Sequence, residues 1–413
     1  MSEDNREKLR ELATIGLVSG GHFWSHFFML AIPSALPLIR GEFAASNFSL
    51  GMVIAASALM GASWQFPMGV LTDRYGARAF LVIGLAIESL ALVFQSYAPT
   101  VPVMIGIAFV AGIADSVFHP ADYTILTAKI RPSWLGRAYA VHTFTGFLGF
   151  ALAPTVMTFL LAHGDWRHAL AVVGFAGLAT ALLLFACGKL LKGTTYPYTK
   201  RANGALPDKN MMQFLLSPPL LTMFIFYIVA TLGSNGLQIF SNSALIDLYH
   251  VDLILANTAL AVFLWGTAIG VLGGGFIADK THRLDAVAAV CYVLAAALLV
   301  AIGMSALSYA ATVGAMFFTG FMLGAVMPSR DLMVRTVTPP GSIGKAFGYV
   351  SSGFSVGGSI APLIYGTLLD MKLPQLVFFT AASMTLATIV IALLASYFSR
   401  RAGTADTAMQ PAN

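Results

Sequence analysis

The sequence predicts an all-α membrane protein with twelve transmembrane helices in two pseudo-symmetric six-helix bundles. Three observations support this fold class. First, 58% of the 413 residues are hydrophobic and only 10% are charged, whereas soluble domains carry about 25% charged residues. Second, the chain contains twelve apolar segments near or above the roughly 20 residues that a helix needs to cross a bilayer. Third, one stretch of the first half recurs in the second half.

The recurring stretch runs from His119 to Pro154 and again from Met327 to Pro362, at a constant offset of 208 residues. Identical residues at equivalent positions include the pairs Pro120/Pro328, Gly136/Gly344, Gly149/Gly357 and Pro154/Pro362. A second pair of segments, 69–74 and 275–280, repeats at an offset of 206. Duplication of a half-chain predicts two bundles related by a pseudo-two-fold axis, which is a common architecture of membrane transporters.

The apolar segments are long and lack the strict alternation of barrel strands, so we expect helices. Their approximate cores are 13–39, 48–71, 79–98, 102–127, 138–163, 167–188, 217–246, 254–278, 284–305, 308–329, 346–369 and 374–398. The longest polar stretch lies between the sixth and seventh segments. We therefore expect bundles at 1–190 and 216–401, a cytoplasmic linker at 191–215 and a disordered tail at 402–413.

The basic residues indicate the orientation. With the N-terminus inside, 19 of the 23 Lys and Arg residues fall in cytoplasmic segments, as the positive-inside rule requires. We expect both termini in the cytoplasm and a location in a bacterial inner (plasma) membrane. The same asymmetry explains the net charge of +5. Long basic runs are absent, so we expect no nucleic-acid partner. The first span has no signal-peptide cleavage site, and we expect it to be retained.

The segment Gly69-Val-Leu-Thr-Asp73-Arg74-Tyr-Gly76-Ala-Arg78 lies in the short loop between the second and third spans. It resembles the signature loop of the major facilitator superfamily, and a weaker copy occurs where that family has one, at 275–283. Such loops act as conformational latches in this family. The resemblance implies latch or gating roles for Gly69, Asp73, Arg74, Gly76, Arg78, Asp279 and Lys280, and we group Asp331 with them.

Two further segments, 146–154 and 353–362, resemble the Gly- and Pro-rich motif of helices 5 and 11 in the same family. Within the superfamily, the chain looks closest to the fosmidomycin-resistance-like permeases. That resemblance is carried by Gly21-His22, Pro33, Pro37, Phe118-His119-Pro120, Gly136-Arg137-Ala138, His142 and Pro328-Ser-Arg330-Asp331. The family resemblance implies a monomeric carrier that works by alternating access, and we expect no cofactor.

Arg330 is the only arginine that we place inside a span. Its guanidinium has a fixed charge and a planar fork suited to carboxylate, phosphate or phosphonate, so we expect a small organic anion as substrate. The family resemblance places helices 1, 4, 7 and 10 around a central cavity, and Arg330 lies on helix 10. Asp122 occupies the equivalent position in the first half. A cytoplasmic gate pair between Asp122 and Arg330 is therefore the alternative interpretation.

Other ionisable side chains inside spans are candidates because burying charge in a bilayer is costly. His22 and His26 are four residues apart and share a helix face, as do Asp115 and His119. A mid-span carboxylate beside histidines can exchange protons near neutral pH. We expect proton coupling at Asp115, His119, Asp122, His142 and Glu88. Structural hydrogen bonding is one alternative, and a transition-metal site built from two or three of these groups is another; we assign no metal site.

The seventh span carries polar side chains that can bind a solute or join helices. We expect substrate contacts from Arg330, His22, His26, Asn235, Gln238, Asn242 and Trp265. Gly233 and Gly236 suggest that this span is flexible or broken.

No phosphate-binding loop, HExxH motif or nucleophile elbow occurs, so we expect neither an enzyme nor an ATP-driven pump. The sequence thus predicts a secondary active transporter, specifically a proton-coupled carrier of a small organic anion. The first alternative is multidrug or cation/metal efflux by proton antiport. The second is a non-transporting receptor, which the short loops disfavour.

Overall fold

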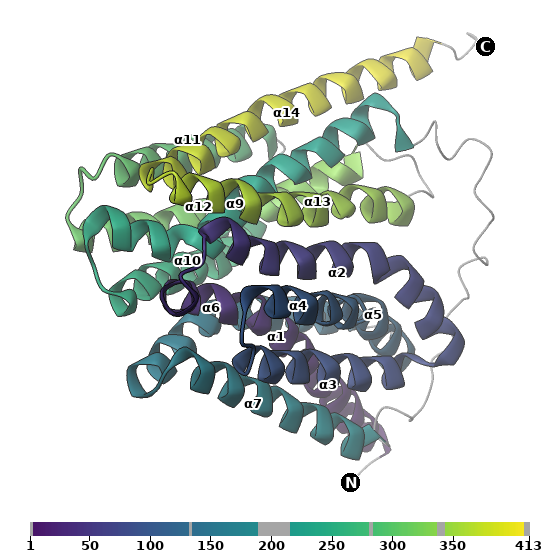
Figure 1. Cartoon of the computed structure of the whole chain (residues 1–413). Helices are drawn as coiled ribbons and strands as arrows, with labels where there is room; N and C mark the ends of the chain where they lie inside the picture. Colours follow the sequence, from purple (N-terminus) through teal and green to yellow (C-terminus); the bar gives the residue numbers. More distant parts are fainter. Residues whose placement is uncertain (1–2, 132–133, 189–214, 281–283, 337–342, 409–413) are drawn as a thin grey trace, which may run out of the picture. The chain divides into compact units, whose positions relative to one another are not determined.

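The computed structural model describes residues 3–131, 134–188, 215–280, 284–336 and 343–408 (Figure 1). Every regular element in these ranges is a helix. Twelve spans in this part of the chain are long and apolar enough to cross a membrane, which confirms the predicted all-α fold. The described helices form two compact units.

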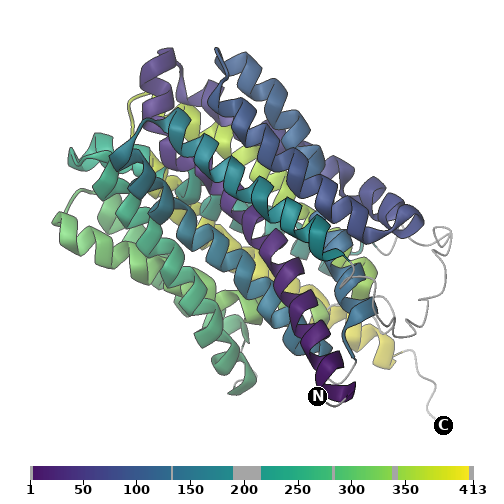
Figure 2. The ribbon, with the colours of Figure 1, turned by 90° about the horizontal axis from the view of Figure 1, so that it is seen from below.

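Unit 1 comprises Met1–Gly204 together with Leu253–Ala261. Its helices are α1 (Glu3–Phe43), α2 (Asn47–Tyr75), α3 (Ala77–Ser96), α4 (Val101–Asp115), α5 (Phe118–Lys129), α6 (Leu135–His163) and α7 (Trp166–Ala186). Within the unit, α1 packs along α6, α3 along α7 and α2 along α4. Figure 2 shows α1, in dark purple, running from the labelled N-terminus into this bundle.

Unit 2 comprises Ala205–Asp252 and Val262–Asn413. Its helices are α9 (Pro218–Tyr249), most of α10 (Leu253–Lys280), α11 (Leu284–Gly303), α12 (Tyr309–Thr336), α13 (Ile343–Asp370) and α14 (Gln375–Ala408). Here α9 packs along α13 and α14, and α11 along α12 and α14. The pairing of α9 with α13 repeats that of α1 with α6, as the internal repeat predicts.

The fourth span differs from the single helix expected at 102–127. It is divided into α4 and α5, and Ser116 and Val117 form the break. Pro120 explains the break, because it cannot donate a hydrogen bond to the Ser116 carbonyl and its ring clashes with that group. At the break, the N–H of Val117 bonds to the carbonyl three residues earlier, that of Ala114, at 3.3 Å. As a result, Asp115 ends α4, and the first turns of α5 carry the other ionisable groups of this span.

The seventh span corrects another expectation. It forms one continuous helix, α9, through Gly233 and Gly236. These glycines serve close packing: a Cβ atom at Gly236 would lie 2.1 Å from Tyr365 Cζ on α13. The missing side chain of Gly236 therefore lets α9 and α13 pack closely, and α9 continues through it without a break.

The Gly-rich motif of the sixth helix has the same effect. A Cβ atom at Gly149 would lie 2.3 Å from the Phe23 carbonyl oxygen on α1, and in unit 2 one at Gly357 would lie 2.7 Å from the Ile228 carbonyl oxygen on α9. Small residues let helix backbones approach closely. The equivalent glycines of the two halves thus fix equivalent helix pairs, α1 with α6 and α9 with α13.

Candidate functional site

Three histidines and an aspartate from three helices meet inside unit 1. These residues, here called the histidine cluster, are His22 on α1, His119 and Asp122 on α5, and His142 on α6. The His22 ring stacks on the His142 ring with centroids 3.9 Å apart, and its centroid lies 5.3 Å from that of His119. One ring nitrogen from each histidine lies within 4.8 Å of the other two. The structure thus brings together four residues that the sequence analysis singled out separately.

Asp122 is the fully buried member of this cluster. Its Oδ2 lies 3.5 Å from His22 Nδ1 and 3.7 Å from His142 Nε2. Within the described part of the chain, no hydrogen bond reaches either carboxylate oxygen, His22 Nδ1 or either ring nitrogen of His142. A buried carboxylate without hydrogen bonds is unfavourable, so this geometry favours the binding of a proton or a cation.

His26 lies beside the cluster, one helical turn from His22. Its ring centroid is 4.4 Å from that of His22 and 4.4 Å from that of Phe150 on α6. A Cβ atom at Gly146 would lie 2.8 Å from His22 Nε2 and 3.1 Å from His26 Nε2. The bare backbone of Gly146 therefore leaves the room that these two imidazoles occupy.

Two further ionisable side chains, Asp115 and Glu88, form a second cluster in unit 1, here called the carboxyl pair. Ser25 Oγ donates a hydrogen bond of 3.1 Å to Asp115 Oδ1. Glu88 on α3 is buried, and it is close enough to Asp115 for the two carboxyl groups to interact electrostatically. Gly61 on α2 makes room for Asp115, since a Cβ atom there would lie 3.3 Å from Oδ2.

In unit 2, Arg330 on α12 lies over two aromatic rings. Its guanidinium carbon is 4.7 Å from the ring centroid of Tyr227 on α9 and 5.0 Å from that of Phe354 on α13. Cation–π attraction holds a guanidinium at such distances without neutralising its charge. Sequence reasoning missed both rings. The offset of 208 could have drawn attention to Phe354, because it makes Phe354 equivalent to Gly146, which lies beside His22 and His26.

The remaining substrate candidates lie on α9, which carries Asn235, Gln238 and Asn242, and on α10, which carries Trp265. Asn242 is buried, and its Oδ1 accepts a hydrogen bond of 2.7 Å from the N–H of Ser243. Asn235 approaches α13, because a Cβ atom at Gly358 would lie 3.1 Å from its Nδ2. Gln238 and Trp265 are half-buried. Their roles in substrate binding stay predictions.

The loop between α2 and α3 turns at Gly76. Gly76 adopts φ 101°, which favours glycine, and its N–H bonds to the Thr72 carbonyl at 2.9 Å. The guanidinium carbon of Arg74 lies 5.3 Å from the ring centroid of Tyr75. Arg78 Nη2 donates a hydrogen bond of 3.2 Å to the Phe185 carbonyl. Gly69 packs near Pro120. The side chains of the other latch candidates, namely Asp73, Asp279, Lys280 and Asp331, lie outside the described residues.

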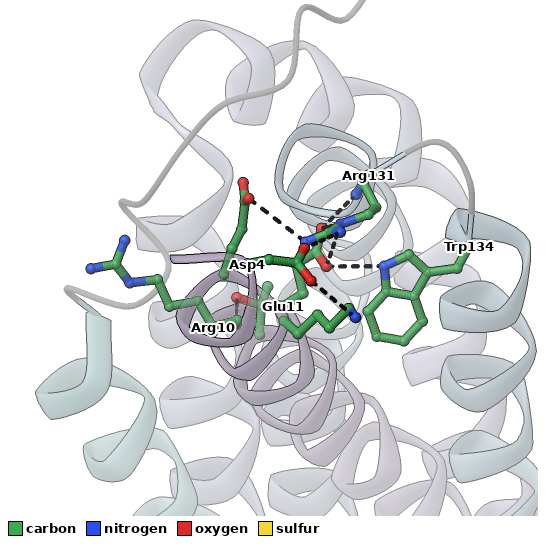
Figure 3. Close-up of polar contacts among 8 residues, drawn as sticks. Asp4, Arg10, Glu11, Arg131 and Trp134 are labelled. Carbon is green, nitrogen blue, oxygen red and sulfur yellow. Dashed lines mark hydrogen bonds and ion pairs between the residues drawn. The ribbon is translucent and has the colours of Figure 1, made fainter. Parts of the chain in front are cut away.

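Sequence reasoning also missed a polar cluster at the end of unit 1 that carries the N-terminus. This N-terminal clasp consists of Asp4, Glu11, Arg131 and Trp134 (Figure 3). The buried Glu11 carboxylate accepts hydrogen bonds from the Arg131 backbone N–H at 2.8 Å, from Arg131 Nε at 3.2 Å and from Trp134 Nε1 at 3.0 Å. Arg131 Nη1 also lies 3.0 Å from Asp4 Oδ1. The clasp ties the start of α1 to the segment between α5 and α6.

Twelve spans in two repeated bundles, with ionisable groups inside the spans, are typical of membrane transporters. The family model described as Major Facilitator Superfamily matches residues 18–256 and 223–408. The chain therefore belongs to the major facilitator superfamily. It is an integral multi-pass membrane protein that transports a small molecule, and it is not an enzyme.

Comparison with individual proteins agrees with this assignment. The chain is similar to the probable sulfoacetate transporter SauU of Cupriavidus necator, with 29% identity over 170 residues, which cover 41% of this chain and only 39% of that relative. It is 24% identical over 390 residues to the fosmidomycin resistance protein of Escherichia coli, which covers 90% of both chains. A bacterial homologue of the human lysosomal transporter Spinster matches with a TM-score of 0.75 at 16% identity, covering 98% of both chains. This last likeness concerns the fold alone.

Proposed function

We propose that the protein is a proton-coupled carrier of a small organic anion and that Arg330 binds the anion. The observation that carries this proposal is the position of the Arg330 guanidinium over Tyr227 and Phe354, inside the helix bundle of unit 2. A permanent positive charge in a transmembrane bundle is costly unless it serves a ligand or a partner. The two aromatic rings orient the guanidinium on this helix, and its fixed positive charge is the kind that recognises an anion.

The chemistry of guanidinium narrows the substrate class. Two of its in-plane N–H groups donate parallel hydrogen bonds to two oxygens of one oxyanion, such as a carboxylate, phosphonate or sulfonate. Sulfoacetate carries two such groups, and a relative of this chain is described as its probable transporter. We therefore propose a small carboxylate, phosphonate or sulfonate as the substrate.

For the coupling ion, the carboxyl pair supports the choice of a proton. Buried Glu88 and half-buried Asp115 interact with each other and cannot both be charged at low cost, so we propose that the pair retains a proton. Ser25 donates a hydrogen bond to Asp115. Glu88 is the second carboxyl group of the pair that can accept a proton. Alternating access would open the pair to one side of the membrane and then to the other, and the proton would be released on the second side.

We further propose a location in a bacterial inner membrane with both termini in the cytoplasm, and a monomeric carrier. The distribution of Lys and Arg along the chain supports this orientation. The N-terminal clasp would then lie at the cytoplasmic end of unit 1.

Anion binding tests the role of Arg330. In detergent-purified protein, sulfoacetate and small carboxylates or phosphonates are expected to raise the unfolding temperature of the wild type, because a ligand of the native state stabilises it. Arg330→Gln is expected to weaken this binding about tenfold or more, roughly 1.4 kcal/mol. The matched control is Arg10→Gln, which removes the same charge at an exposed position where the side chain points away from its neighbours (Figure 3).

The anion proposal fails if Arg330→Gln and the wild type bind the same anions with equal affinity. If lipophilic cations or divalent metals are instead the only ligands, and bind both proteins equally, the alternative of cation/metal efflux replaces it.

Proton coupling is tested separately in proteoliposomes. Asp115→Asn is expected to abolish substrate accumulation driven by a pH gradient while leaving substrate exchange in the absence of a gradient, because the neutral side chain can no longer release a proton. Asp252→Asn changes an exposed aspartate and is expected to behave as the wild type. Gradient-driven accumulation by Asp115→Asn at the wild-type level would exclude the carboxyl pair as the coupling site.

A further inference from the structure

We infer that the histidine cluster of unit 1 is a binding site for a divalent transition-metal ion such as Zn²⁺ or Ni²⁺, with His22, His119 and His142 as its ligands and the Asp122 carboxylate beside two of them. This site is distinct from Arg330 and from the carboxyl pair, and the inference does not depend on the proposed substrate or coupling ion. It goes beyond the sequence prediction, which assigned no metal site.

The distances are those of metal ligands rather than of hydrogen bonds. A tetrahedral Zn²⁺ site with bonds of about 2.0–2.1 Å separates its ligand atoms by about 3.3 Å. Asp122 Oδ2 lies 3.5 Å from His22 Nδ1 and 3.7 Å from His142 Nε2, near this value and too far for strong hydrogen bonds. The three histidine nitrogens lie within 4.8 Å of one another, so modest side-chain rotations close the site around an ion.

A second observation is independent of the spacing. Asp122 is fully buried, and neither of its oxygens has a hydrogen-bond donor among the described residues. His22 Nδ1 and both nitrogens of His142 are buried and equally lack a partner in that part of the chain. Five buried polar atoms on three neighbouring side chains, without hydrogen-bond partners among the described residues, are costly in a bundle interior. A divalent cation would coordinate several of them and supply the counter-charge for the carboxylate.

The ligand types select the metal. Imidazole nitrogens suit Zn²⁺, Ni²⁺, Co²⁺ and Cu²⁺, whereas Mg²⁺ and Ca²⁺ prefer sites made of oxygen ligands. His22 and His142 are buried, whereas His119 is exposed. Because the ligands come from α1, α5 and α6, a bound ion would link three helices of unit 1 and stabilise their packing.

Zinc chloride alone is the probe for this site. The intact protein is purified in detergent without a polyhistidine tag, and bound zinc is measured by equilibrium dialysis and elemental analysis. The wild type is expected to bind one Zn²⁺ per chain and to unfold at a higher temperature with zinc than without it. His119→Gln and His142→Gln are each expected to weaken zinc binding about tenfold or more. His163→Gln removes an exposed histidine on the same helix as His142 and is the matched control.

Two features keep the test decisive. His119 is exposed, so His119→Gln leaves the core packing intact and decides the question even if His142→Gln does not fold. Substitution of Co²⁺ for Zn²⁺ adds a direct readout, because tetrahedral Co²⁺ absorbs visible light strongly and hydrated Co²⁺ does not. The inference is overturned if the wild type binds no zinc, or if His119→Gln and His163→Gln bind zinc with the same affinity.

Discussion

Glu11→Ala is expected to lower the free energy of unfolding by about 3 kcal/mol, because it removes the centre of the N-terminal clasp. The Glu11 side chain is 2% exposed and the Arg131 side chain 23%. Loss of the carboxylate leaves the Arg131 backbone N–H and the Trp134 indole N–H without their acceptor. Breaking a buried ion pair costs about 3–5 kcal/mol, and the partial exposure of Arg131 places this change at the lower end of that range.

The matched control is Asp4→Ala. Asp4 contacts the same arginine, but its side chain is 56% exposed, and exposed ion pairs contribute only about 0–1 kcal/mol. Thermal unfolding in detergent, followed by circular dichroism and by tryptophan fluorescence, compares the two variants with the wild type. Equal destabilisation by Glu11→Ala and Asp4→Ala would show that the clasp is held by diffuse surface charge and not by the buried carboxylate.

The clasp shows why part of the structure could not be read from the sequence. Glu11 and Arg131 are separated by 120 residues, and each lies in a polar segment where a charged residue is unremarkable. Their pairing depends on how α1 packs against α5 and α6. The spans could be predicted, because hydrophobicity and length are properties of each segment alone. The division of the fourth span was also readable in principle from Pro120, whose effect on a helix is local.

The candidate site was predictable only in its parts. Spacing of three or four residues placed His119 and Asp122 on one helix face, and their position inside a span marked them as functional. That His22 and His142 would stack above Asp122 required the close approach of α1 and α6, which no spacing rule supplies. The aromatic partners of Arg330 were missed for the same reason, since Tyr227 and Phe354 look like ordinary core residues in the sequence.

The internal repeat relates these two sites to each other. Asp122 and Arg330 occupy equivalent positions. In unit 1 the carboxylate lies between imidazoles from α1 and α6, and in unit 2 the guanidinium lies over rings from the equivalent helices α9 and α13. One helix arrangement therefore holds a negative side chain in the first half and a positive one in the second. On our proposals, the first accepts a cation and the second an anion.

Gly149→Ala is expected to lower the free energy of unfolding by about 2–3 kcal/mol, in the range of overpacked cores. The new Cβ atom would lie 2.3 Å from the Phe23 carbonyl oxygen and 3.1 Å from the Phe27 nitrogen. Both are backbone atoms of α1 and cannot rotate away, so α1 and α6 must separate. His22 and His142 lie on these two helices with ring centroids 3.9 Å apart, and the separation is therefore expected to reduce zinc binding as well as stability.

Gly106→Ala provides the control of opposite sign. A Cβ atom at Gly106 on α4 would meet no atom within 4 Å, and replacing glycine by alanine inside a helix stabilises it by about 0.5–1 kcal/mol when space allows. Thermal unfolding with and without zinc chloride measures both effects in each variant. If Gly149→Ala were as stable as Gly106→Ala, the contact between α1 and α6 would be looser than the structure shows. Because the histidine cluster depends on that contact, its geometry would then have to be revised too.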